Sequence, residues 1–146
     1  MYMIEQDTIR LLRECDAGIK MGISSIRDSV KYVKNDEFRR ILERSLEQHE
    51  LIAADMQELL AVYHDDGKEP AAMAKGMEWF KTNITLAVED SDAAVADFIT
   101  EGCHMGVKSL ARYLNQYKAA DEKSKDITKR LIREEDELAV DIRLYL

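Results

Sequence analysis

Two segments of the chain carry the same helical pattern of apolar and small residues, and this repetition limits the folds available to the sequence. The segments are 11–26 and 96–117, and a shift of 88 positions places Cys15 on Cys103. In both segments the large apolar residues recur in steps of three and four, which is the spacing of one buried helix face. The sequence therefore predicts a duplicated helical hairpin.

The apolar spacing predicts four long helices and one shorter one. The long helices are expected at 8–33, 36–63, 92–117 and 127–145, and a shorter amphipathic helix is expected at 69–88. Short turns join the first helix to the second and the third to the fourth, whereas the segment with the shorter helix joins the two hairpins. This order predicts an all-α four-helix bundle with one long crossover.

Length and composition favour a single folded domain that covers residues 1–146. Hydrophobic residues make up 46% and charged residues 34%, which is too apolar for a disordered chain. The net charge of −8 argues against a general binder of nucleic acid and against docking on an anionic membrane. No stretch approaches the about 20 apolar residues that a membrane span requires. We therefore expect no nucleic-acid or membrane partner, and a homodimer stays open.

The cellular compartment is inferred from the amino-terminal segment and the cysteines. The first ten residues, MYMIEQDTIR, have neither the basic region nor the continuous apolar region of a secretory signal. Cys15 and Cys103 occupy equivalent positions on apolar helix faces, as small core residues do in a reducing compartment. We therefore expect a cytoplasmic protein.

Each long helix carries one ionisable residue at or near its apolar face: Asp16, His49, His104 and Glu135. We expect the four side chains to share one layer of the bundle. One interpretation is two buried ion pairs, Asp16 with His49 and Glu135 with His104, because none of these groups is easily buried alone. The other is a metal site, since two imidazoles and two carboxylates from four helices suit one divalent Zn, Fe or Mn ion. Both interpretations stay open, and so does a ligand pocket or an accidental, partly exposed placement of these residues.

Several short motifs give the chain a family resemblance. These motifs are Cys15-Asp16-Ala17-Gly18, Cys103-His104-Met105-Gly106, Gln48-His49-Glu50 and Glu69-Pro70. With them the chain resembles the ferritin-like superfamily, and most closely an uncharacterised bacterial family of ferritin-like four-helix-bundle proteins. The resemblance implies a ferritin-like bundle. In the di-metal members of that superfamily, the first and third helices each supply a Glu and the other two each supply Glu-x-x-His.

The chain departs from that ligand pattern on every helix. The first helix offers Asp16, and the second has His49 with Leu46 in place of the paired Glu. The third helix offers His104, and the fourth has Glu135 without a histidine. We therefore expect a soluble protein with a non-catalytic binding role or a stress-related structural role. The alternatives are a protein that binds one divalent metal ion and an oxidoreductase with a degenerate di-metal centre.

Overall fold

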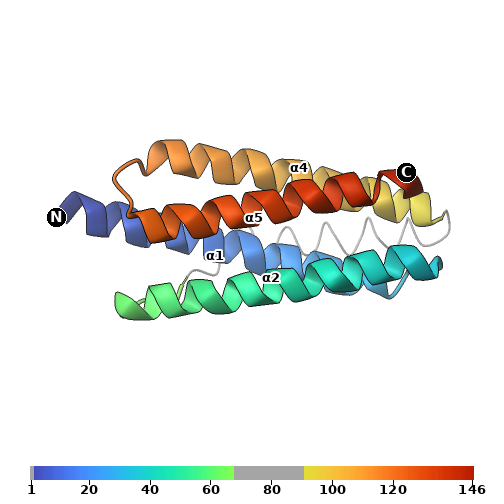
Figure 1. Ribbon diagram of the computed structural model, residues 1–146, viewed down its shortest axis with the longest axis horizontal. Coiled ribbons are helices and arrows are strands. Elements are labelled where there is room, and N and C mark those ends of the chain that lie inside the picture. The colour runs from blue at the N-terminus through green and yellow to red at the C-terminus, as the bar shows by residue number, and fades with distance from the viewer. Residues whose placement is uncertain (1, 68–90) are drawn as a thin grey trace.

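The computed structural model describes residues 2–67 and 91–146, and the regular secondary structure of these ranges is entirely helical (Figure 1). The all-α four-helix bundle predicted from the sequence is confirmed in these ranges. The elements are α1 (Tyr2–Val30), α2 (Asp36–Val62), α4 (Asp92–Gln116), α5 (Glu122–Asp141) and the short turn η1 (Arg143–Tyr145). The helix expected at 69–88 lies outside the described residues. No helix within the described ranges has the length and apolar character needed to cross a bilayer.

The four helices run antiparallel to their neighbours. α1 packs most extensively against α2, and α4 packs against α5, so each hairpin forms a close pair. The pairs meet through contacts of α2 with α5 and of α1 with α4. Figure 1 shows that α2 ends at one end of the bundle and α4 begins at the other. The link between the hairpins therefore joins opposite ends of the molecule, as the predicted crossover requires.

Two helices begin at residues whose side chains cap them. Asn35 accepts a hydrogen bond from the Phe38 N–H at 2.9 Å, which confirms the expected start of α2. Asp121 accepts from the Ser124 N–H at 2.8 Å and fixes the start of α5 at Glu122. The fourth helix therefore begins several residues earlier than its apolar pattern alone indicated.

Side-chain contacts tie the loop of each hairpin to the other hairpin. Asp92, at the start of α4, accepts hydrogen bonds of 2.8 Å from the backbone N–H groups of both Lys34 and Asn35. At the opposite end, the Thr8 hydroxyl accepts a 2.8 Å bond from the Asp121 N–H. These bonds fix the ends of the two hairpins relative to each other.

The apolar core consists of two clusters, one toward each end of the bundle. The cluster near the α1–α2 turn includes Ile26, Phe38, Leu42, Ile99, Cys103 and Leu138. The cluster near the α4–α5 turn includes Leu11, Ile19, Ile52, Leu110, Ile127 and Leu131. Between the two clusters, the interior of the bundle is lined by residues that belong to neither cluster. Two of these residues, His49 on α2 and Glu135 on α5, are ionisable.

Candidate functional site

The middle of the bundle holds a layer of two ionisable residues and two glycines, which we call the polar layer: Gly22, His49, Gly106 and Glu135. His49 on α2 faces Glu135 on α5, with 2.7 Å between Nε2 and Oε1. The His49 side chain is completely buried, and the Glu135 side chain is 13% exposed. An ion pair with this burial requires good geometry and further hydrogen bonds to offset the loss of solvation.

The second nitrogen of the His49 ring is also bonded. Nδ1 lies 2.8 Å from the backbone oxygen of Ser45, one helical turn earlier on α2. Because a carbonyl oxygen can only accept, Nδ1 carries a hydrogen and donates it. The ring is therefore held at both nitrogens, which fixes its orientation toward α5.

The two glycines lie directly beside this pair. A β-carbon added at Gly22 would lie 3.4 Å from His49 Cδ2 and 3.6 Å from Glu135 Oε1. A β-carbon added at Gly106 would lie 3.6 Å from Glu135 Oε2. These distances are ordinary van der Waals contacts, so each position has room for about one methyl group beside the pair and not for a larger side chain. The sequence repeat did not reveal this, because it aligns Gly106 with Gly18, which has open space around it.

Burial and hydrogen bonding act on the pKa of His49 in opposite directions. Burial is the largest effect and lowers the pKa, because it disfavours the charged imidazolium. The hydrogen bond and charge of Glu135, the Ser45 carbonyl and the charge of Glu134 act the other way and together prevail. The pKa of His49 is therefore raised above its ordinary value, which favours an imidazolium–carboxylate pair.

The two cysteines are buried and free, in agreement with the interpretation of them as core residues. Burial raises the pKa of the Cys15 thiol to about 12, although its 3.1 Å hydrogen bond with Thr128 opposes this shift. Burial also raises the pKa of Cys103, and the charge and hydrogen bond of Glu135 add to the effect. Thiols that stay protonated are poor nucleophiles and poor metal ligands.

Asp16 lies in a separate polar cluster, so the predicted pair of Asp16 with His49 is wrong. Its carboxylate is 1% exposed and lies 2.8 Å from Lys20 Nζ and 2.7 Å from Gln57 Nε2. Gly67 covers the carboxylate, and a β-carbon added there would lie only 2.2 Å from Asp16 Oδ2. The lysine one turn further along α1 supplies the counter-charge that we had assigned to His49.

His104 is exposed on α4, so the predicted pair of Glu135 with His104 is also wrong. The buried positions nearby on α4 are Cys103 and Leu110, and Gly106 contacts Glu135 between them. His104 follows Cys103 directly and is therefore turned by about 100° around the helix axis. The imidazole that pairs with Glu135 comes from α2 instead.

The predicted four-residue layer is thus only partly formed. The structure brings His49 and Glu135 together, places Asp16 in another cluster and leaves His104 at the surface. Among the described residues, no group of three or more His, Cys, Asp and Glu side chains is arranged to hold a metal ion. The four residues therefore do not form the shared site expected for one Zn, Fe or Mn ion.

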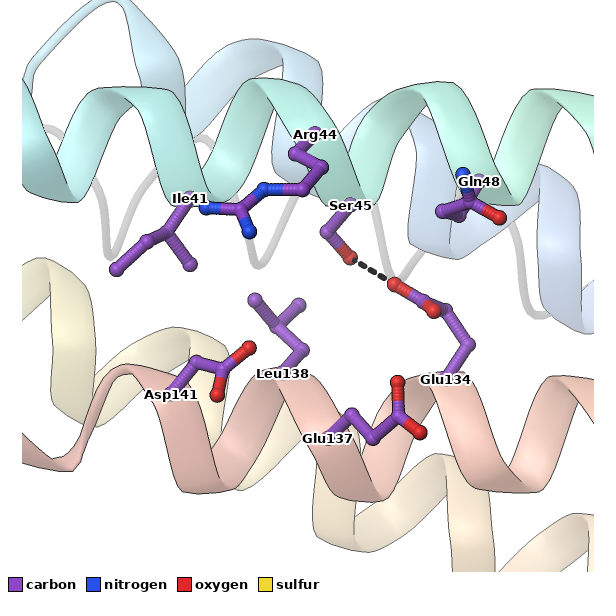
Figure 2. Close-up of a pocket in the computed structure, with 8 residues that line it drawn as sticks. All are labelled: Ile41, Arg44, Ser45, Gln48, Glu134, Glu137, Leu138 and Asp141. Carbon is purple, nitrogen blue, oxygen red and sulfur yellow. Dashed lines mark hydrogen bonds between the residues drawn. The ribbon is translucent and has the colours of Figure 1, made fainter.

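A groove between α2 and α5 adjoins the polar layer (Figure 2). It has a volume of about 270 Å³, with Ile41 and Leu138 as its apolar lining. The polar lining residues are Arg44, Ser45 and Gln48 from α2, and Glu134, Glu137 and Asp141 from α5. Figure 2 shows the side chains of Glu137 and Asp141 on the α5 side of the groove, and the Arg44 guanidinium lying along α2 beside Ile41. We call this feature the α2–α5 groove.

Ser45 connects the groove to the polar layer, a role that the sequence pattern did not reveal. Its hydroxyl donates a 2.9 Å hydrogen bond to Glu134 Oε1 at the groove wall, shown as a dashed line in Figure 2. Burial raises the pKa of Glu134, although the bond from Ser45 and the charge of His49 oppose this shift. In the sequence, the only signal is that Ser45 lies one helical turn before His49. This spacing predicts that the two residues are neighbours on one helix face, but it does not predict the bond from Ser45 to Glu134.

The chain was compared with known protein families, with curated proteins and with solved structures, and no match was found. The resemblance to the ferritin-like superfamily therefore depends on the sequence motifs and the helix order, and it stays a prediction.

Replacing Glu135 with alanine should destabilise the bundle strongly. The variant leaves the buried His49 ring without the partner of Nε2, so we expect Glu135→Ala to lower the free energy of unfolding by about 3 kcal/mol at pH 6. The matched control is Glu137→Ala, an exposed position two residues away, with an expected change within about 0.5 kcal/mol. Urea unfolding measures the free energy of both variants. An equally small loss of stability in both would contradict the buried ion pair of His49 and Glu135.

Stability should fall as the pH rises above neutral. Because the folded pKa of His49 is raised, its contribution is complete below the unfolded pKa of about 6.5 and is lost as pH rises through the folded pKa. Between these two values we expect the free energy of unfolding to fall by about 1 kcal/mol per pH unit. Urea unfolding from pH 6 to pH 8 tests this. The range ends at pH 8 because cysteine thiols of the unfolded chain ionise at about pH 8.5, which would lower the stability independently of His49.

The control for the pH series is His49→Gln, which keeps a polar side chain but does not titrate. We expect this variant to be less stable than the wild type at pH 6 and to show a clearly flatter pH dependence. A wild-type profile that is flat over the range, or an equally steep profile in the variant, would show that the pair does not hold the proton.

Two glycine substitutions should change stability in opposite directions. Gly67 has φ = +93° and lies against Asp16, so Gly67→Ala should destabilise by about 1–2 kcal/mol. Gly18 lies within α1 with no atom within 4 Å of an added β-carbon, so Gly18→Ala should stabilise by about 0.5–1 kcal/mol. Thermal or urea unfolding of both variants tests the assignment, and a stabilising Gly67→Ala would contradict the described contact with Asp16.

Proposed function

We propose that the protein is a non-catalytic binding protein and that the α2–α5 groove binds small organic cations. The observation that carries the proposal is the row of carboxylates from Glu134, Glu137 and Asp141 beside an apolar lining. Steps of three and four place these residues on one face of α5, about 4.5 Å and 6 Å apart along the helix axis. Arg44 is the single cation among the lining residues, so the groove carries a net negative charge.

The lining favours an alkyl diamine within this class of ligand. Two ammonium groups separated by three or four methylene groups match the spacing of neighbouring carboxylates, and the methylene groups can contact Ile41 and Leu138. Among the described residues, neither Glu137 nor Asp141 makes an ion pair within 4 Å, so binding breaks no internal pair of these groups. The Ser45 hydroxyl is engaged with Glu134, which supports a positioning role for Ser45 and no part in catalysis.

The helix order supports the family resemblance as part of this proposal. Two hairpins joined between opposite ends of the bundle have the connectivity of ferritin-like folds, which contain one long crossover. We therefore propose a ferritin-like bundle in which a binding groove at the α2–α5 interface has replaced a di-metal centre as the functional feature.

Calorimetric titration with butane-1,4-diamine tests the proposed site. We expect saturable binding that weakens as salt is added, because part of the groove is exposed and its charges are screened. The double variant Glu137→Gln, Asp141→Asn should bind at least about tenfold more weakly, equivalent to about 1.4 kcal/mol. The matched control is Glu58→Gln, Asp97→Asn, which removes two exposed charges outside the groove.

Two outcomes would contradict the proposed function. One is the absence of saturable binding to the wild type at low salt. The other is an equal loss of affinity in the control variant, which would mean that the diamine responds to net charge and not to the α2–α5 groove.

A further inference from the structure

The wall of the α2–α5 groove and the buried histidine are joined by one residue. Ser45 is almost fully buried, and its hydroxyl donates to Glu134 Oε1 at 2.9 Å. Its backbone oxygen accepts from His49 Nδ1 at 2.8 Å, and its hydroxyl oxygen lies 3.4 Å from the same nitrogen. Ser45 therefore links the carboxylate of Glu134, which lines the groove, to the buried ring of His49 in the polar layer.

The hydrogen bonds of His49 show where its protons lie. Nδ1 must donate to the Ser45 carbonyl, and Nε2 faces a carboxylate oxygen of Glu135 at 2.7 Å. Two lone pairs at this distance would repel each other, so one further hydrogen lies between Nε2 and Oε1. His49 and Glu135 thus share a proton. Its removal would place the lone pair of His49 Nε2 directly against the carboxylate of Glu135.

The groups that face this proton come from all four helices. α5 contributes the charges of Glu134 and Glu135, and α4 contributes Cys103, whose thiol is hydrogen-bonded to Glu135. α1 contributes Gly22, which has no side chain, and α2 contributes Ser45. Of the charged groups acting on His49, Glu134 also lines the groove. The negative charge of Glu134 favours the protonated imidazole of His49, and the positive charge of that imidazolium in turn favours ionised Glu134.

We infer that the α2–α5 groove and the pair of His49 and Glu135 form a proton-linked unit. In this unit, neutralising Glu134 at the groove wall lowers the affinity of the pair for its proton. A cation bound beside Glu134 is one way to neutralise it, and in this respect the inference rests on the proposed function. Because linkage is reciprocal, loss of the proton strengthens binding of that cation by the same factor. The protein would then bind such cations more tightly as the pH rises.

The first test needs no ligand and uses the nitrogen chemical shifts of the histidine rings as a function of pH. The His49→Gln variant identifies the His49 signals among those of the three histidines. Glu134→Gln keeps an acceptor for Ser45 but removes the charge, and we expect it to lower the titration midpoint of His49 by about 0.5–1 pH unit. The matched control is Glu137→Gln, which also lines the groove but has no bond to Ser45, and its midpoint should move much less.

The second test repeats the titration with butane-1,4-diamine at saturating concentration. A midpoint that falls in the wild type, but not in Glu134→Gln, supports the inference. An unchanged midpoint in Glu134→Gln alone overturns it, and so does an unchanged midpoint in wild type that binds the diamine. If Glu134→Gln lowers the midpoint but the diamine does not bind, the linkage is supported and the proposed function fails.

Discussion

A fully buried imidazole whose two ring nitrogens both need partners sets the arrangement of this bundle. His49 meets that need through the Ser45 carbonyl on its own helix and the Glu135 carboxylate on α5. On the other two helices, Gly22 and Gly106 lie beside the pair, at distances where even one β-carbon would be in van der Waals contact with it. This hydrogen-bond requirement therefore fixes the relative positions of α2 and α5, and α1 and α4 place small residues beside the pair.

The polar layer also gives the core its division into two apolar clusters. Within each cluster, contacts between apolar side chains lack directional preference, and similar side chains can replace one another at modest cost. The buried pair is directional and intolerant of a missing partner. We therefore regard the clusters as the main source of stability and the polar layer as the feature that selects one packing. The α2–α5 groove lies beside the layer, and through Ser45 its chemistry is continuous with the buried pair.

The sequence predicts the helices well but not the contacts between them. The spacing of apolar residues correctly identified four long helices and correctly placed His49 and Glu135 on buried faces. The spacing did not show that His49 pairs with Glu135. Periodicity within one helix does not determine how far that helix is shifted along the bundle axis relative to its neighbours. The repeat aligned Asp16 with His104, yet one is buried beside Lys20 and the other is exposed. A step of one residue turns a side chain by about 100°, enough to move it out of the core.

The most direct test of this account is a double-mutant cycle between the two members of the buried pair. The free energy of unfolding at pH 6 is measured for the wild type, for His49→Gln, for Glu135→Gln and for the double variant. We expect a coupling energy of about 2 kcal/mol, because the two side chains share one buried hydrogen bond. A coupling energy below about 0.5 kcal/mol, the level at which separate sites are additive, would contradict the claim that this pair organises the bundle.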